Sequence, residues 1–255
     1  MAAFPAVAQS EWTKIRSVRS TVWTLALTFV VTLLVGTLLS LVTKNNFADV
    51  TKDSSTPFDA TGTAFSGIML GELAIVVFGV LAVGNEYSSG MIRVSLAAVP
   101  QRGTLLAAKA AVLAALAFAV SLVTVFVTFF VAQAVLGEHS TSLGDEGVLR
   151  AVFSAACYLT LLCLFAAGIT VLLRNQTLAL GILVPFFFLL SPILSVVPKV
   201  KTVAHYFPDW AGSRSIQVYQ PADQPYGPWV GLLICAAWAA AALLCGYLVL
   251  KKRDA

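Results

Sequence analysis

The sequence predicts an all-α, polytopic membrane protein with six transmembrane helices, an N-terminal interfacial helix and a short cytoplasmic helix. Of the 255 residues, 59% are hydrophobic and only 11% are charged, whereas soluble domains are about 45–50% apolar and about 25% charged. Apolar runs long enough to cross a bilayer, about 20 residues each, are spread from residue 20 to residue 250. The charges are too few to cover a soluble surface, so we expect a single transmembrane domain over residues 1–255.

Six apolar segments have the length of a membrane span. In chain order they cover residues 20–42, 66–84, 104–136, 151–173, 177–197 and 230–250. The fifth contains Pro185 and Pro192, and a proline inside a helix removes a hydrogen bond. This span should therefore be bent or broken near its outer end. Because only residues 174–176 separate the fourth and fifth spans, we expect those two to form a tight antiparallel hairpin.

The distribution of lysine and arginine predicts the orientation of the chain. Ten of the sixteen basic residues fall on the side of the predicted spans that holds both chain ends, and six fall on the other side. Both termini should therefore be cytoplasmic. The longest outer loop, residues 198–229, is rich in proline, tyrosine and tryptophan. Since tyrosine and tryptophan favour the membrane–water interface, part of this loop should lie against the membrane.

Residues 1–19 have the pattern of an amphipathic helix. Apolar residues recur at spacings of three to four, and the basic residues fall largely on other faces of the helical wheel. The apolar set is Val7 or Ala8, Trp12, Ile15 and Val18. A helix of this kind lies in the cytoplasmic interface of a membrane. A positively charged anchor for the first span would carry the same basic residues, and both interpretations stay open.

The loop between the second and third spans, residues 85–104, is much longer than a tight hairpin needs. Ser88 and Ser89 are suitable helix N-caps, and Pro100 disfavours helical geometry at the residue before it. The loop should therefore contain a short, partly apolar helix parallel to the membrane. Such a helix, with charged residues on both sides, can dock in a groove of a cytoplasmic partner. A solvated loop is the alternative.

Three motifs in this chain resemble segments of the permeases of ABC type-2 exporters. Glu11-Trp12-x-Lys14, before the first span, resembles the interfacial elbow helix of that family. The run Glu86-Tyr87-x-x-Gly90-Met91-Ile92-Arg93, then Pro100-x-Arg102 and Lys109, resembles its coupling helix, where many members have Gly-Thr in place of Gly90-Met91. Phe207-Pro208-x-x-Ala211-Gly212 resembles its outer segment after span five. With the six-span plan, the resemblance covers nearly the whole chain.

The resemblance implies a membrane-spanning permease subunit of an ATP-driven exporter in a bacterial cytoplasmic membrane. It implies a second permease, identical or paralogous, and separate ATPase subunits that use ATP and Mg. The residues that would couple to the ATPase are Glu86, Tyr87, Gly90, Met91, Arg93, Pro100 and Arg102, and those of the elbow helix are Glu11, Trp12 and Lys14. The chain itself would bind no cofactor and catalyse no reaction. Its other contact would be membrane lipid, and its charge distribution does not indicate nucleic-acid binding.

Glu72 is the one ionisable residue well inside a predicted span. Its insertion costs about 2.5–3.5 kcal/mol, which the apolar neighbours can offset, so Glu72 should face protein or water rather than lipid. A role in the substrate pathway or its gating and a structural hydrogen bond to another span both stay open. Gly67 and Gly71 form a G-x-x-x-G motif, which lets helix backbones approach closely. We expect this motif to pack within the chain rather than at a dimer seam.

Signatures of other functions are missing from the sequence. No glycine is followed by lysine, so the chain has no Walker A phosphate loop, and it has neither H-E-x-x-H nor G-x-S-x-G. The four cysteines lie in apolar runs without metal-ligand spacing, which predicts no metal site. Two alternatives to a transport subunit remain. One is an enzyme acting on lipid-borne substrates, which would need a catalytic cluster, and the other is a membrane-embedded scaffold.

Overall fold

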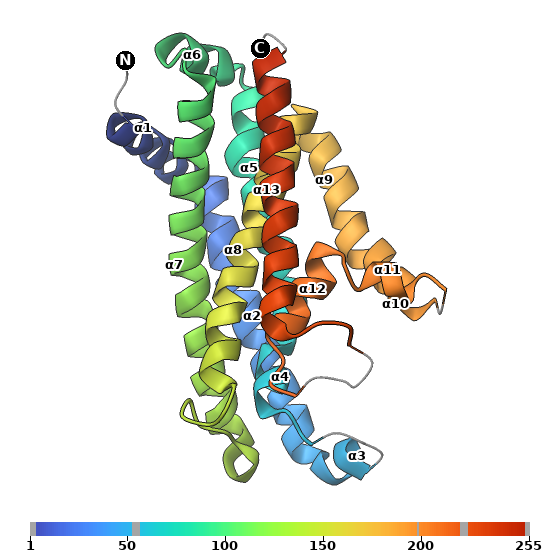
Figure 1. Cartoon of the computed structure of the whole chain (residues 1–255). Helices are drawn as coiled ribbons and strands as arrows, with labels where there is room; N and C mark the ends of the chain where they lie inside the picture. The colour runs from blue at the N-terminus through green and yellow to red at the C-terminus, as the bar shows by residue number, and fades with distance from the viewer. Residues whose placement is uncertain (1–3, 53–56, 198, 220–223, 253–255) are drawn as a thin grey trace.

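The structure, a computed structural model, describes residues 4–52, 57–197, 199–219 and 224–252. Within these ranges six helical segments are long and apolar enough to cross a membrane (Figure 1). They cover Arg19–Asn45, Ala60–Ser88, Arg102–His139, Val148–Leu173, Gln176–Leu194 and Pro228–Lys252. Each coincides with one of the six predicted spans, so the prediction of an all-α, six-span membrane protein is confirmed.

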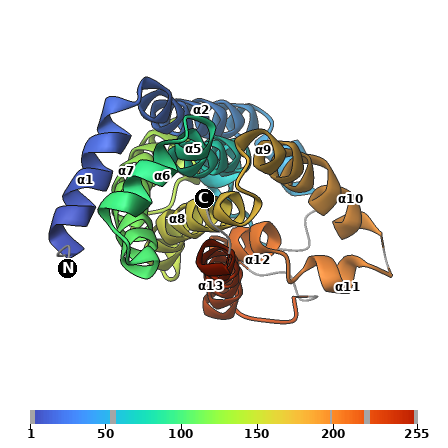
Figure 2. The same ribbon diagram turned by 90° about the horizontal axis from the view of Figure 1, so that it is seen from above.

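The first half of the chain forms three spans and three further helices, α1, α3 and α6, that do not cross the bundle. Its elements are α1 (Phe4–Ser17), α2 (Arg19–Asn45), α3 (Phe47–Lys52), α4 (Ala60–Ala64), the 3₁₀ turn η1 (Phe65–Gly67), α5 (Ile68–Ser88), α6 (Met91–Ala98), α7 (Arg102–Leu136) and the 3₁₀ turn η2 (Gly137–His139). Helix α1 lies along the outside of α7, and α6 lies across the same end of the bundle (Figure 2).

The second half forms the other three spans and the helices of the outer loop. Its elements are α8 (Val148–Leu173), α9 (Gln176–Pro185), the π-helical segment η3 (Phe186–Leu190), α10 (Ser191–Val196), α11 (Lys201–Ala204), α12 (Pro208–Ser215) and α13 (Pro228–Lys252). Both chain ends and α6 lie at one end of the bundle, and α3 lies at the other (Figure 1).

Helix α8 is the centre of the bundle and packs against α5, α7, α9, α12 and α13 (Figure 2). A helix that is apolar on all sides is expected to be surrounded in this way. Small residues let its neighbours approach closely. A Cβ atom on Gly168 would lie 2.7 Å from the backbone of Ala242 on α13. The contact between α8 and α13 therefore depends on this glycine.

Helix α2 shows how the lipid-facing side of the bundle differs from its inner side. Apart from Leu25, its buried face carries small and hydroxyl residues, namely Thr21, Thr28, Thr32, Gly36 and Ser40. Its exposed face carries large apolar residues, namely Val22, Trp23, Leu27, Leu34, Leu38 and Leu41. This arrangement is the reverse of a soluble helix. It is expected where lipid replaces water, because close backbone packing rather than apolar burial then holds helices together.

The G-x-x-x-G motif packs against α2. A Cβ atom on Gly67 would lie 2.2 Å from the carbonyl oxygen of Thr32, and one on Gly71 would lie 2.0 Å from the Thr32 hydroxyl oxygen. Neither position has room for a side chain. The prediction that this motif packs within the chain is confirmed.

Two local predictions for span five and its connection are also confirmed. The regular helix changes to π-helical geometry at Phe186, directly after Pro185, which is an interruption of the expected kind. The hairpin between α8 and α9 turns at Arg174, whose φ is 55°. The Asn175 side chain then caps α9 by accepting from the backbone N–H of Leu178 at 2.9 Å.

The predicted N-cap of the short helix between the second and third spans is wrong. The hydroxyls of Ser88 and Ser89 donate to the carbonyl oxygen of Asn85, at 3.2 and 2.6 Å, so they serve the end of α5. Helix α6 begins after Gly90, which has a φ of 71°. Glycine adopts this left-handed conformation at little cost, and a backbone reversal therefore separates the two helices in place of a serine cap.

Candidate functional site

Helix α6 presents a mostly apolar outer face at the end of the bundle that carries both chain termini. Ile92 and Ser95 are buried against the bundle. Met91, Arg93 and Val94 are exposed, and Val94 is 68% exposed. An exposed apolar face with one arginine on a short, well-anchored helix has the properties of a docking surface.

A buried ion cluster lies directly beneath α6 and joins three other helices. It consists of Glu11 and Lys14 on α1, Glu86 on α5 and Lys109 on α7. Lys14 Nζ lies 2.6 Å from Glu11 Oε1 and 3.0 Å from Glu86 Oε1. Lys109 Nζ lies 2.8 Å from Glu86 Oε1 and also pairs with Glu11 Oε2. Lys14 donates a further hydrogen bond to the Ser95 hydroxyl at 2.9 Å, which connects the cluster to α6.

The ion cluster is balanced, with two carboxylates and two ammonium groups. Glu11, Glu86 and Lys109 are only 1%, 3% and 4% exposed. Burial of a charge is costly unless it is paired and hydrogen-bonded, and removal of one partner of a buried pair costs about 3–5 kcal/mol. Burial by itself would lower the pKa of Lys14, but hydrogen bonding to Glu11 and attraction to Glu86 outweigh it and raise that pKa. Lys14 is therefore charged at neutral pH.

The structure separates the predicted coupling residues into an internal and an external group. Glu86 is buried in the ion cluster, and Tyr87 is half-buried against the core. Gly90, Met91, Arg93 and Pro100 are exposed. The Arg102 guanidinium donates to the backbone carbonyls of Leu250 and, at 3.3 Å, of Lys251. Arg102 thus joins the end of the 85–104 loop to the C-terminal end of α13, where a cation is favoured.

Helix α1, the predicted elbow helix, buries part of its predicted apolar set together with one charged residue. Its buried residues are Val7, Glu11 and Ile15, whereas Trp12 is 47% exposed. Glu11 takes the inner position because Lys14 and Lys109 pair with its carboxylate. An exposed tryptophan agrees with a helix in the membrane interface, where the apolar face meets lipid. Amphipathic spacing alone would leave Glu11 on the polar side, and the cation on the distant helix α7 brings it inside.

An open groove of about 400 Å³ lies between α1, α6 and the start of α7. Its walls are mostly apolar and include two residues of the ion cluster, Glu11 and Lys14. The residues that line it are Ala6, Val7, Ser10, Glu11, Lys14, Met91, Val94, Ser95, Ala98, Val99 and Leu105. A partner that contacts α6 would therefore also meet α1. Both helices contact the ion cluster, α1 through Glu11 and Lys14 and α6 through Ser95.

The membrane-embedded carboxylate Glu72 lies on α5, which packs against α2 and α8. It faces protein rather than lipid, as predicted, because it is only 7% exposed and accepts a hydrogen bond from the Tyr158 hydroxyl on α8. The same hydroxyl lies 3.3 Å from the carbonyl oxygen of Asp209. Glu72 therefore makes the structural hydrogen bond that was one of its two possible roles. It also lines a cavity with Asp209, so the pathway role stays open.

Sequence reasoning placed Asp209 among the acidic residues of the outer loop and did not single it out. In the structure α12 folds back against α8 and α13, and Asp209 is buried. The close packing depends on Gly212, where a Cβ atom would lie 2.0 Å from Cδ2 of Tyr158. The available signal was the Phe207-Pro208-x-x-Ala211-Gly212 motif, whose proline begins α12 and whose glycine meets the Tyr158 ring.

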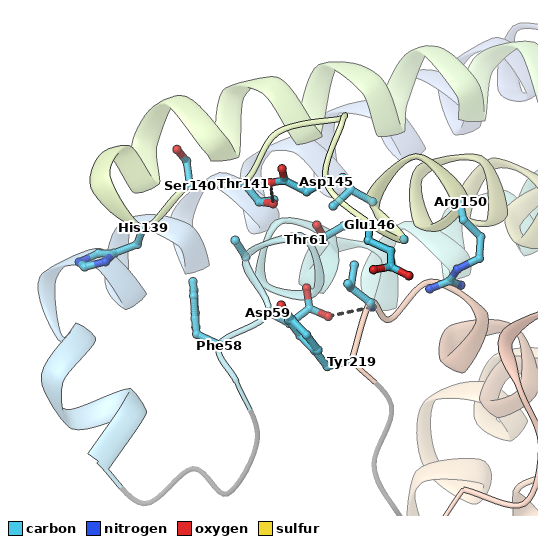
Figure 3. A pocket seen from close by; sticks show the side chains of 14 residues that line it. Phe58, Asp59, Thr61, His139, Ser140, Thr141, Asp145, Glu146, Arg150 and Tyr219 are labelled. Carbon is cyan, nitrogen blue, oxygen red and sulfur yellow. Dashed lines mark hydrogen bonds between the residues drawn. The ribbon is translucent and has the colours of Figure 1, made fainter.

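A polar pocket of about 610 Å³ lies at the end of the bundle opposite α6 (Figure 3). Its charged side chains hold loops together. Asp59 accepts from the backbone N–H of Gly62 at 2.8 Å and of Val218 at 3.0 Å. Arg150 donates to the carbonyls of Ser215 and Gln217, both at 2.7 Å. Asp59 and Arg150 therefore join the α4, α8 and α12 regions at this end of the bundle.

The sequence matches the family described as ABC-2 family transporter protein over residues 7–195. No curated protein matches it. The matched region runs from α1 into α10, and includes the ion cluster, α6 and Glu72. It covers well over half of the chain, and the six spans agree with it. The chain therefore belongs to the ABC-2 family of transporter proteins and is a multi-pass membrane permease component of an ABC transporter.

Proposed function

We propose that this chain is the permease subunit of an ATP-driven exporter, and that α6 couples it to a separate ATPase subunit. The ATPase would bind ATP and Mg, and a second permease, identical or paralogous, would complete the pathway. The observation that carries the proposal is the ion cluster. It connects α1, α5 and α7 through charged groups and reaches α6 through Ser95.

The ion cluster provides a physical route from an ATPase to the spans. A push on α6 would act on Lys14 through Ser95, and Lys14 shares the Glu86 carboxylate oxygen with Lys109. Because separating buried, paired charges costs much free energy, these helices would move as one unit. Glu86 would then act inside the permease, and exposed Met91, Arg93 and Val94 would contact the ATPase.

The orientation that we propose puts α6, α1 and both chain ends in the cytoplasm of a bacterial cell. The support is twofold. The excess of lysine and arginine lies on this side of the spans. Both chain ends also lie beside α6, at one end of the bundle (Figure 1).

The test is an affinity pull-down of the tagged chain from gently solubilised native membranes, with the eluate assayed for ATPase activity. The wild-type chain should recover a Walker-A-containing partner at roughly equal stoichiometry. Val94→Asp should abolish that recovery, because it places a charge on the exposed face of α6. Val203→Asp is the matched control, since Val203 is 59% exposed on α11 at the opposite end.

Two outcomes would count against the proposal. Recovery of the chain without any ATPase in several mild detergents would favour the scaffold or the lipid-directed enzyme. Equal recovery of the ATPase by both aspartate variants would leave an ATPase partner in place but remove α6 as its docking helix.

A further inference from the structure

We propose that the cavity between α5, α10 and α12 binds the protonated amine of an amphipathic molecule, with Asp209 and Glu72 as the anionic partners. The inference rests on the proposed function in one respect: the bound amine would be the exporter's cargo. Neither carboxylate is needed for ATPase docking, which takes place at the other end of the chain's spans.

The cavity has the size and walls of a small-molecule site. Its volume is about 430 Å³, within the range of about 300–1,000 Å³ that is typical of ligand pockets. Its apolar walls come from η1, α5, η3 and α12 and include Phe65, Ile68, Met69, Phe187 and Ile216. Glu72 and Asp209 both line it, and each is only 7% exposed. An apolar body with one polar head would match this lining.

The hydrogen bonds of the two carboxylates are incomplete. Tyr158 donates to Glu72 Oε2 and Ser191 donates to Asp209 Oδ2. The other oxygen of Asp209, Oδ1, is buried without a hydrogen-bond partner of good geometry in the described part of the chain, although the N–H groups of Asp209 and Trp210 lie beside the carboxylate. Buried polar atoms are normally satisfied. A donor brought by a ligand would fill this place.

The electrostatics of the cavity favour a cation. Glu72 and Asp209 line the same cavity, and two carboxylates in apolar surroundings repel when both are ionised. Within the described ranges neither has a salt bridge. Arg214, one turn further along α12, stacks on Trp210 at 4.7 Å from the ring centroid and donates to Gln217 Oε1 at 3.0 Å. His205 also stacks on Trp210, with centroids 5.7 Å apart.

The chemistry of the site selects an ammonium group over a metal ion. The described residues contain no group of three histidine, cysteine, aspartate or glutamate side chains that could hold a metal. An ammonium group needs fewer ligands, and it can donate hydrogen bonds to Oδ1 of Asp209 and to the carboxylate of Glu72. The apolar walls would then cover the remainder of the molecule.

The experiment compares two probes that differ in a single charge. Monodansylcadaverine carries a primary amine on an apolar fluorophore, and its N-acetyl derivative has the same body without the charge. Binding would be followed by dansyl fluorescence at pH 7, with the purified permease in nanodiscs of zwitterionic lipid and without ATPase or nucleotide. The amine should bind at least about ten-fold more tightly than its acetylated form, the order expected for a charge-assisted hydrogen bond.

Variants identify the site. Asp209→Asn should weaken binding of the amine probe by about ten-fold or more and leave binding of the acetylated probe unchanged. Glu72→Gln should act in the same direction. Asp145→Asn, at a carboxylate in the outer loop between α7 and α8, is the matched control and should have no effect. Size-exclusion chromatography and thermal unfolding would establish that each variant is folded.

Equal affinity of the wild-type protein for the two probes would overturn the proposal, whether or not any variant folds. Equal loss of affinity in Asp145→Asn and Asp209→Asn would also overturn it, because the charge would then act from the surface. Selective amine binding in a chain that recovers no ATPase would keep the site and reject the exporter. An ATPase complex without amine selectivity would do the reverse.

Discussion

Lys109 of α7 and Glu86 of α5 form a buried ion pair, with Lys109 Nζ 2.8 Å from Glu86 Oε1. Their positions are 23 residues apart along the chain, on the two sides of α6. The pair therefore closes the 85–104 loop at its base, and Lys14 and Glu11 attach the elbow helix to the same point. Helix α6, the proposed coupling helix, is consequently anchored to the bundle at this point.

Lys109→Met should strongly destabilise the protein. It leaves the two buried carboxylates with one ammonium group, and such a loss costs about 3–5 kcal/mol. For a domain of this size we expect thermal unfolding in detergent to shift down by roughly 6–20 °C. Lys252→Met, at an exposed lysine, should shift it by very little. Equal effects of the two substitutions would show that the buried pair is not a source of stability.

Charge reversal should separate the buried from the exposed residues of the proposed coupling segment. Glu86→Lys should lower both the unfolding temperature and the recovery of an ATPase, because Glu86 is buried with two lysines. Arg93→Glu should leave stability within about 0.5 kcal/mol, as expected for a surface position, and weaken only the ATPase interaction. Unfolding curves and pull-downs on the same preparations would measure both effects. A loss of stability in Arg93→Glu equal to that in Glu86→Lys would contradict this division.

Gly212→Ala should displace α12 from α8. Its new Cβ atom would lie 2.0 Å from the Tyr158 ring, and overpacking of this kind costs about 1–3 kcal/mol. The hydrogen bond from Tyr158 to Glu72 should weaken as well. Gly181→Ala is the matched control, because no atom lies within 4 Å of its added Cβ, and it should be neutral or slightly stabilising. Thermal unfolding of both variants checks the prediction, and similar unfolding temperatures would argue against a close contact.

The contribution of Lys14 to stability should be lost at alkaline pH. Its pKa in the folded protein is raised above the ordinary value of 10.5, so the folded state holds the proton more tightly than the unfolded state. The stabilisation is then fully present below the unfolded pKa and falls as pH rises through the folded pKa. The difference in unfolding temperature between wild type and Lys14→Met should shrink above about pH 10.5. A difference in unfolding temperature that stays constant up to about pH 11.5 would contradict this prediction.

Much of the architecture follows from local properties of the sequence. A bilayer requires about 20 apolar residues for each helix. The six spans and their connections could therefore be placed from the positions of the apolar runs. The interruption of span five and the turn at Arg174 follow from a proline and from a three-residue connection. The intrachain packing of Gly67 and Gly71 was also accessible, because glycines at helical spacing mark close backbone contacts.

Residues far apart in the chain are brought together only by the tertiary structure. Lys109 pairs with Glu11 across 98 positions, and Tyr158 meets Glu72 across 86. Periodicity shows which residues share a face of a helix, but it does not show which helix covers that face. For this reason the pattern did not place Glu11 inside and left Asp209 in an outer loop. The sequence by itself determined where the chain crosses the membrane, and the packing of α1, α7, α8 and α12 decided which charges are buried together.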